Sequence, residues 1–554
     1  MLLRATITNK TIGSKQLLRD LDLKVDEGEK VGLIGRNGVG KTTLFGVLAG
    51  ADEDFEGEVV GRRGISIIST AQEHIGVGSQ SCVDYILQGL PEYKRLQQII
   101  YHHPDSMGQD MSKISEYTAA LERFNSLGYY DIEDKVLNAL EAYQITNEMA
   151  RNPLVRLSGG QRRFVELVKV TQSDPDLALI DEPTNHMDYV AKAAFIAWLK
   201  SAKGAVIVIT HDRDVLKQVD RIVEMKDLSA VSFKGNYDAY LQQNSSQTVS
   251  DINQYEVAQR TINNIKKQIA YARSKKAGWS GTADKKNPFV VMETRLIKQL
   301  KELEATVGRP SFWIDQESVE QLDDKVTESY DRYKAKNIRL SGLDSAANYH
   351  NLLHVTKLSL GYDAPLFKDV SFELASGDHV NLKGRNGAGK TTLIRAIRQR
   401  IGDGTDASAE RYAGTIACEP RIRLGVYEQE IAGEYLELGL GEAVLAVFRS
   451  HNLPLNQQTV RRTMADYLFD PAGDYNTPLK KLSGGQRARF QLIAMLCHKP
   501  DLLILDEPTN HLDLPSIEEL ENALVGFQGA ILYVSHDSYF CDAIAGTIVQ
   551  IGPV

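Results

Sequence analysis

The chain has 554 residues, of which 42% are hydrophobic and 25% charged, and its formal net charge is −9. Because a domain has roughly 150 residues, this length predicts three or four folded units. No apolar run approaches the roughly 20 residues that a membrane-spanning helix needs. The chain start, MLLRATITNK, lacks a signal-peptide core, and the four cysteines show no CxxC spacing, which argues against a zinc site or disulfide framework and favours a cytoplasmic location.

The first predicted elements are a buried strand at 31–34 (VGLI), a glycine-rich loop at 35–43 (GRNGVGKTT) and a helix that begins at its end. The pattern GxxxxGK[ST] between a strand and a helix is the phosphate-binding loop, where backbone N–H groups converge on phosphate oxygens. The same succession returns at 380–392 (VNL, then GRNGAGKTT). The two loops supply these candidate nucleotide-binding residues: Gly35, Asn37, Gly38, Gly40, Lys41, Thr42 and Thr43, and Gly384, Asn386, Gly387, Gly389, Lys390, Thr391 and Thr392.

Two further apolar strands end in a carboxylate, LALID at 177–181 and LLILD at 502–506. Each lysine of the phosphate-binding loops should reach the β- and γ-phosphates, and the adjacent threonine should ligate Mg²⁺ together with the strand-end aspartate. The predicted magnesium ligands are therefore Thr42 with Asp181 and Thr391 with Asp506, directly or through water.

Three more residue types complete each predicted site. Glu182 and Glu507 follow the metal carboxylate and can orient or deprotonate the attacking water. A histidine ends another apolar strand in each copy, in VIVITHD and ILYVSHD, and a glutamine precedes the LSGGQ motif. These candidates are His211 and His536 near the γ-phosphate, and Gln72 and Gln429 as sensors of the metal and the water.

Five motifs therefore occur twice in one order, which indicates a duplicated domain of roughly 200–240 residues. The set, with LSGGQ at 157–161 and 482–486, resembles the ATP-binding cassette superfamily. The resemblance implies two cassettes that pack head to tail around two ATP molecules, each with Mg²⁺, and two hydrolytic sites. In this arrangement each site is completed by the LSGGQ residues of the other half: Ser158, Gly160, Ser483 and Gly485.

The family usually stacks adenine on an aromatic residue of an early strand. Tyr362 occupies that place in the second half, whereas the gapless equivalent in the first half is Gly13, with Ile12 beside it. The resemblance therefore implies a weaker hold on adenine at the first site, or a ring borrowed from elsewhere.

Within the superfamily, the chain resembles the ABC-F group of soluble twin cassettes joined by a charged helical linker. Shared features are DEPTNH in both halves, GNYDAY at 235–240, and a segment from Gln72 to Leu157 of 85 positions against 53 from Gln429 to Leu482, which suits an extra helical arm at about 80–145. The expected fold is α/β, with two P-loop NTPase cassettes in tandem joined by an antiparallel helical hairpin. The expected domains are a first cassette at 1–240, a linker at 241–345 and a second cassette at 346–554.

Apolar residues recur every three or four positions from Tyr255 to Ala272, and a second stripe runs from Phe289 to Val307, so the linker is predicted as two helices. Residues 260–286 hold eight lysines or arginines and one aspartate. A basic tip at 273–288 with one indole suits RNA, whose backbone attracts cations and whose bases stack on aromatic rings. The candidate RNA-binding residues are Arg273, Lys275, Lys276, Trp279, Lys285 and Lys286.

The group resemblance implies a monomer that binds the ribosome near the E site and acts through the linker on P-site tRNA and the peptidyl-transferase centre, with rRNA as a partner and neither membrane nor DNA. Two roles remain open: a housekeeping translation factor, which is favoured, and an antibiotic-resistance factor that protects the ribosome. The ATPase subunit of a membrane transporter is the alternative from another class.

Overall fold

The computed structural model describes residues 1–13, 15–70, 79–106, 110–185, 187–226, 228–277, 287–306, 313–315, 318–319, 321–334, 338, 351–402, 409–428, 431–510 and 512–552. The chain forms two compact units. One contains Met1–Tyr237 together with Ile338–Val554, and the other is the intervening segment Asp238–Asn337. None of the helices among the described residues combines the length and the apolar character needed to cross a membrane.

The first half of the large unit is built on a six-stranded sheet that is parallel except for its last strand. Its strands, in spatial order, are β5 (Ile67–Ser69), β6 (Leu177–Asp181), β7 (Ala205–Ile209), β3 (Lys30–Gly35), β8 (Arg221–Lys226) and the antiparallel β9 (Ser229–Lys234). Its central strands are almost wholly buried, as expected for parallel strands covered on both faces. A three-stranded antiparallel sheet shares this core and contains β2 (Lys15–Val25), β1 (Leu3–Ile12) and β4 (Glu56–Gly61).

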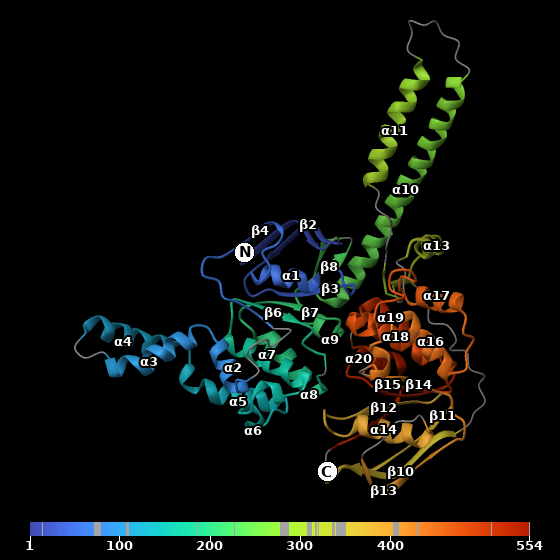
Figure 1. Cartoon of the computed structure of the whole chain (residues 1–554). Coiled ribbons are helices and arrows are strands. Elements are labelled where there is room, and N and C mark those ends of the chain that lie inside the picture. Colours follow the sequence, from blue (N-terminus) through green and yellow to red (C-terminus); the bar gives the residue numbers. More distant parts are fainter. Residues whose placement is uncertain are drawn as a thin grey trace. The chain divides into compact units, whose positions relative to one another are not determined.

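The helices of this half begin with α1 (Lys41–Leu48), directly after β3. In Figure 1, α3 (Tyr93–Ser106) and α4 (Met111–Ser126) lie side by side within the segment where the sequence predicts an arm. They enclose a small core around Leu96, Ile99 and Ala120. The remaining helical segments are α2 (Cys82–Gly89), η1 (Tyr129–Asp131), α5 (Ile132–Ala142), α6 (Asn147–Ala150), η2 (Leu154–Arg156), α7 (Gly159–Ser173), α8 (Tyr189–Ser201) and α9 (Arg213–Leu216).

The second half repeats this plan, which confirms the predicted fold class. Its five parallel strands are, in spatial order, β14 (Leu424–Tyr427), β15 (Leu502–Asp506), β16 (Ala530–Val534), β12 (His379–Lys383) and β17 (Thr547–Gln550). Its antiparallel sheet contains β11 (Pro365–Ala375), β10 (Asn351–Gly361) and β13 (Glu410–Cys418). Its helices are α14 (Lys390–Ile401), α15 (Gly433–Leu436), α16 (Leu440–Ser450), α17 (Gln457–Asp466), η3 (Leu479–Lys481), α18 (Gly484–Leu496), α19 (Leu514–Val525) and α20 (Ser538–Ile544).

The small unit is helical and contains nearly all of α10 (Tyr237–Ala277), with α11 (Pro288–Thr306) and α13 (Asp324–Tyr333). Helices α10 and α11 run alongside each other (Figure 1) and are joined by an ion pair between Lys266 and Glu304. The predicted hairpin is therefore present. Helix α10, however, begins at Tyr237, well before the predicted apolar stripe that starts at Tyr255, and its 41 residues span roughly 60 Å at 1.5 Å per residue.

Candidate active sites

The first phosphate-binding loop lies between β3 and α1, and its backbone requires glycine. Gly40 precedes α1 with φ 107°, and a Cβ at Gly35 would lie 2.6 Å from the Met225 carbonyl oxygen. The buried Lys41 Nζ donates to the carbonyl oxygens of Gly35 (2.6 Å) and Arg36 (3.3 Å). Burial lowers the pKa of Lys41 from its usual value, although the charge of Glu182 opposes the shift.

The second loop, between β12 and α14, has the same geometry. Gly389 precedes α14 with φ 95°, and Lys390 Nζ donates to the carbonyl oxygens of Gly384 (2.8 Å) and Arg385 (3.0 Å). Burial again lowers the pKa of the lysine. The other predicted loop residues fall on these two loops and the first turns of their helices, namely Asn37, Gly38, Thr42 and Thr43 before or in α1, and Asn386, Gly387, Thr391 and Thr392 before or in α14.

The structure brings the predicted magnesium ligands together in both halves. Thr42 Oγ1 donates to Asp181 Oδ2 at 2.9 Å, and Thr391 Oγ1 donates to Asp506 Oδ2 at 3.1 Å. A hydroxyl and a carboxylate are hard oxygen donors of the kind Mg²⁺ prefers, so each pair fits the ion. The predictions for Gln72 and Gln429 fall outside the described residues.

The two candidate catalytic glutamates occupy strained and buried positions. Glu182 has φ 46° and Glu507 has φ 52°, a conformation rare for residues other than glycine. Burial, the largest cause, raises the pKa of each carboxyl to about 8. The approach of a cation would lower this pKa and favour the ionised carboxylate. Each glutamate can therefore be protonated without the cation and become a proton acceptor when the cation is near.

Each glutamate faces the predicted histidine of its own half. His211 Nε2 lies 3.6 Å from Glu182 Oε1, and His536 Nε2 lies 3.3 Å from Glu507 Oε1. Burial lowers the pKa of His211 to about 3 and that of His536 to about 4, so both imidazoles are neutral at pH 7. A neutral imidazole can donate from one nitrogen and accept at the other.

The LSGGQ serines start helices. Ser158 caps α7 and Ser483 caps α18, and in both the glutamine three residues later completes a capping box. A Cβ at Gly485 would lie 2.3 Å from Asn37 Nδ2, which places this glycine against the phosphate-binding loop of the first half. Gly160 has the equivalent position in the first turn of α7.

A pair of aspartates makes the contact between the halves reciprocal. The Asn37 backbone N–H donates to Asp513 Oδ2 at 3.4 Å, and the Asn386 backbone N–H donates to Asp188 Oδ2 at 3.2 Å. Both aspartates also cap the following helix, α19 or α8. Both stand two residues after the repeated DEPTNH motif, and no role was predicted for them from the sequence.

A cavity of about 340 Å³ lies at this contact and is lined by both halves. Its walls contain the predicted residues Asn37, Gly38, Thr42, Asp181, Glu182, His211, Ser483, Gly485, Glu507 and His536. They also contain Thr70, Arg163 and Lys192, which the sequence analysis did not identify.

The expected adenine contacts lie on exposed turns. Tyr362 directly follows β10, and its side chain is 43% exposed, so its ring is accessible. Gly13 directly follows β1, and the adjacent Ile12 is 55% exposed. The second half therefore presents an aromatic surface where the first presents an aliphatic one.

Half of the candidate RNA-binding residues fall on the end of α10. Arg273 and Lys276 pair with Glu293 of α11 at 2.7 and 3.1 Å, and Lys275 Nζ lies 5.9 Å from the ring centre of Tyr271. The paired side chains remain 63% and 46% exposed, so they can still meet a polyanion. Trp279, Lys285 and Lys286 lie outside the described residues.

The chain matches the family model described as ABC transporter over residues 18–185 and 367–510. It is 29% identical to the putative ATP-binding protein YdiF of Bacillus subtilis, over all of this chain and 80% of that protein. It is 30% identical to the probable ATP-binding protein YheS of Escherichia coli, over 95% of this chain and 75% of that protein. It is 29% identical to the energy-dependent translational throttle protein EttA of Haemophilus influenzae, over 97% of this chain and 89% of that protein.

Solved structures share the fold. An RNase-L inhibitor superposes with a TM-score of 0.55 at 16% identity, covering all of this chain and 90% of that one. An archaeal ribosome recycling factor, aABCE1, solved with the stalk protein aP1, gives 0.54 at 16% identity, over 98% of this chain and 87% of that one. Both likenesses extend through the two halves of the chain.

Proposed function

The chain belongs to the ABC-F family of ATP-binding cassette ATPases, and from this premise we propose that it is a cytoplasmic translation factor that binds the ribosome near the E site. Its interdomain linker would then act on P-site tRNA and the peptidyl-transferase centre. The observation that carries the proposal is the end-to-end match to EttA, whose name describes an energy-dependent throttle of translation. The long hairpin of α10 and α11 between two cassettes supplies the reach that such an action needs.

ATP hydrolysis is the activity of the family, and we assign it to two composite sites. In the first, Lys41 holds the terminal phosphates, and Ser483 and Gly485 of the other cassette close over them. In the second site, Lys390 holds the terminal phosphates, and Ser158 and Gly160 of the first cassette close over them. Mg²⁺, when bound by Thr42 with Asp181 and by Thr391 with Asp506, would neutralise phosphate charge.

The protein groups around each terminal phosphate divide the remaining tasks. Glu182 or Glu507 orients the attacking water and accepts its proton, for which a raised pKa is well suited. His211 or His536 is neutral and can donate one hydrogen bond to the phosphate that is being released. Because serines and glycines from the opposite cassette complete each site, ATP favours pairing of the cassettes and hydrolysis weakens it.

Pairing of the cassettes would in turn control ribosome binding. The residues of the predicted basic tip would contact RNA, namely Arg273, Lys275, Lys276, Lys285 and Lys286, with the indole of Trp279. Because such contacts release counterions, the affinity should fall as salt rises.

The test is ribosome pelleting with the double variant Glu182→Gln, Glu507→Gln. Neutral amides keep the shape of the carboxyls but cannot take the proton, so ATP should trap the paired state. The variant should pellet with ribosomes in ATP but not in ADP. A matched control, Lys41→Ala with Lys390→Ala, should fail in both nucleotides. Absence of pelleting in ATP at low salt, with ATP binding measured separately, would remove the ribosome from the proposal.

A further inference from the structure

The two catalytic histidines are followed by different residues, although both loops begin the same way. Asp212 and Asp537 each cap the next helix through Oδ1, which accepts two backbone N–H groups. Beyond this shared cap the halves diverge, because Arg213 and Asp214 correspond to Ser538 and Tyr539. The interface between the cassettes is therefore chemically unequal on its two sides.

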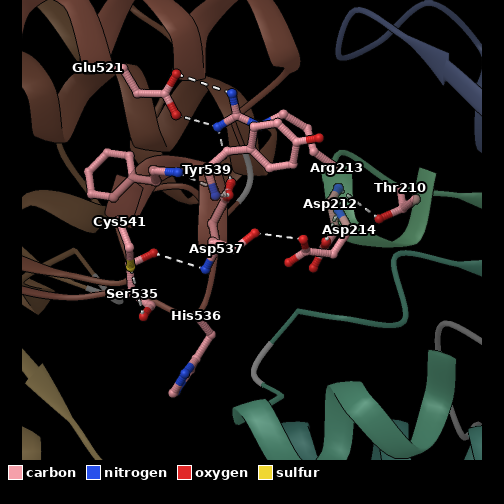
Figure 2. A network of polar contacts seen from close by, with 12 residues as sticks. Thr210, Asp212, Arg213, Asp214, Glu521, Ser535, His536, Asp537, Tyr539 and Cys541 are labelled. Atoms are coloured by element: carbon pink, nitrogen blue, oxygen red, sulfur yellow. Dashed lines mark hydrogen bonds and ion pairs between the residues drawn. The ribbon is translucent and has the colours of Figure 1, made fainter. Parts of the chain in front are cut away.

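Figure 2 shows Arg213 and Asp214 of the first cassette facing Asp537 and Tyr539 of the second. Arg213 forms an ion pair with Glu521 of α19 and lies 3.4 Å from Asp537 Oδ2. The Ser538 hydroxyl donates to Asp214 Oδ1 at 2.6 Å. The guanidinium also lies over the Tyr539 ring, 4.7 Å from its centre. Buried charges are tolerated when they are paired in this way, so the contact has a defined geometry.

Lys192 extends this network to the backbone of a catalytic loop. Its side chain is buried, and its Nζ lies 2.8 Å from Asp212 Oδ2 and 2.5 Å from Asp214 Oδ2. It also donates to the carbonyl oxygen of His536, in the other cassette, at 3.1 Å. An ammonium group has three N–H donors, and three acceptors surround this one.

The opposite side of the interface has an aliphatic residue at the equivalent position. Lys192 stands four residues after the helix-capping Asp188, and the residue four after Asp513 is Ile517. Ile517 is buried like Lys192, and both line the shared cavity. An aliphatic side chain cannot donate a hydrogen bond to the carbonyl of His211. At this position, therefore, the first cassette holds the histidine loop of the second, and the second does not hold that of the first.

We propose that Lys192 is a positioning residue that acts across the interface on the second composite site. It holds the carbonyl side of His536, while Glu507 Oε2 accepts the His536 backbone N–H at 3.3 Å. The loop is thus fixed on both sides of the residue, and the imidazole stays beside the Glu507 carboxyl. Burial is the main cause of the lowered pKa of His536, and the charges of Lys390 and Lys192 add to it. The inference rests on the proposal that both composite sites hydrolyse ATP.

The experiment isolates each site in the full chain. Glu182→Gln leaves turnover at the second site, and Glu507→Gln leaves turnover at the first. Adding Lys192→Met should lower kcat about tenfold in the Glu182→Gln background with little change in KM, because a misplaced group acts on the chemical step. In the Glu507→Gln background the loss should be clearly smaller, because at the first site Lys192 contacts the side chains of Asp212 and Asp214 and not the backbone of the histidine itself. Lys192→Arg, which keeps the charge and the donors, should restore most of the loss.

A neighbouring lysine provides the matched control. Lys217 Nζ lies over the same Tyr539 ring at 4.6 Å, and Lys217→Met should leave both single-site rates unchanged. Equal losses in both backgrounds from Lys192→Met would indicate general destabilisation and overturn the inference. If one single-site background has no turnover even with Lys192 intact, the two-site proposal fails by itself.

Amide hydrogen exchange tests the inference by a measurement that does not depend on ATP turnover. Lys192→Met should accelerate amide exchange severalfold in residues 535–540 relative to Lys217→Met, because a loop that loses an anchoring hydrogen bond opens more often. Unchanged exchange there would overturn the inference.

Discussion

At the scale of single residues, Glu182 and Glu507 combine a left-handed backbone with a buried carboxyl. A left-handed conformation in a residue other than glycine costs about 1–3 kcal/mol, and it persists only where the surroundings impose it. Here the imposing contacts are the backbone hydrogen bonds from Glu182 to Ile209 and from Glu507 to Val534, on the neighbouring strands. The backbone strain therefore lies at the residue that is proposed to orient the attacking water.

The double variant Glu182→Gln, Glu507→Gln should unfold at a higher temperature than the unchanged protein, by a margin that grows from pH 5 to pH 8. A carboxyl whose folded pKa is raised to about 8 contributes full stability below its unfolded pKa and loses it as pH rises towards 8. The loss is on the order of 1 kcal/mol per pH unit per site, and an amide does not incur it. Thermal unfolding without nucleotide measures the margin.

The matched control for this prediction is Glu293→Gln. Its carboxyl is paired with Arg273 and Lys276, which hold its pKa below the usual range, so it stays ionised from pH 5 to pH 8. Its unfolding temperature should therefore differ from that of the unchanged protein by a constant amount. A margin for the double variant that is equal at pH 5 and pH 8 would contradict the assigned burial.

At the scale of elements, the cassette strands and loops were predictable because their patterns are local. Apolar runs that end in Asp181 or Asp506 identify strands whose carboxyl ends lie beside the phosphate-binding loops. This placement predicts a contact between each aspartate and the threonine of its loop, and the structure has both contacts. The start of α10 was not predictable in this way. Its buried face continues from Tyr240 through Asn244 and Thr248 to Ile252, so two polar residues interrupt the apolar period.

Asn244 is buried because its side-chain amide donates to the Trp313 carbonyl oxygen at 2.8 Å, a tertiary contact with no local signal in the sequence.

Tertiary contacts also limited what could be predicted about the candidate active sites. The contacts of Asp188 and Asp513 with the opposite loops depend on how two cassettes pack, which no periodicity encodes. Lys192 was missed because an isolated lysine usually indicates solvent exposure.

The hairpin supports a prediction about its basic end. Glu293 neutralises part of the charge of Arg273 and Lys276, so Glu293→Gln should strengthen binding to single-stranded RNA. The gain should be severalfold at low salt and should shrink as salt rises. Fluorescence anisotropy with a labelled RNA oligonucleotide measures it.

Glu304→Gln is the control for the hairpin, since Glu304 pairs with Lys266 farther from the helix end. It removes the same charge, so it should strengthen RNA binding less if the contacts gather at the tip. Equal gains from both variants would show that overall charge, not the tip, determines the affinity.

At the scale of the whole molecule, the two cassettes contact each other through the predicted phosphate-binding loops. The contact of Gly485 with Asn37 and the two aspartate contacts link each phosphate-binding loop to the opposite cassette. Any displacement between the cassettes must therefore disturb both composite sites. The unequal network around Arg213 and Lys192 means that the two sites need not be disturbed equally.

A cysteine pair tests this arrangement. A Cβ at Gly485 would lie 3.2 Å from Asn37 Cβ, slightly closer than the roughly 3.5–4.5 Å found in disulfides, so a small outward shift would bring the pair into range. Asn37→Cys with Gly485→Cys should therefore form an intramolecular crosslink under mild oxidation, seen as faster migration in a non-reducing gel that a reductant reverses. Each single-cysteine variant should migrate like the unchanged protein. Failure of the pair to crosslink, with or without ATP, would contradict the contact.

The cassettes are joined by the covalent chain through the helical segment Asp238–Asn337, and this has a kinetic consequence. Two cassettes on separate chains would pair at a rate set by their concentration. Here each cassette meets a partner whose effective concentration the connecting segment sets. Dilution cannot separate them, so under the proposed function the fraction of paired molecules should follow the ratio of ATP to ADP and should not depend on the number of copies in the cell.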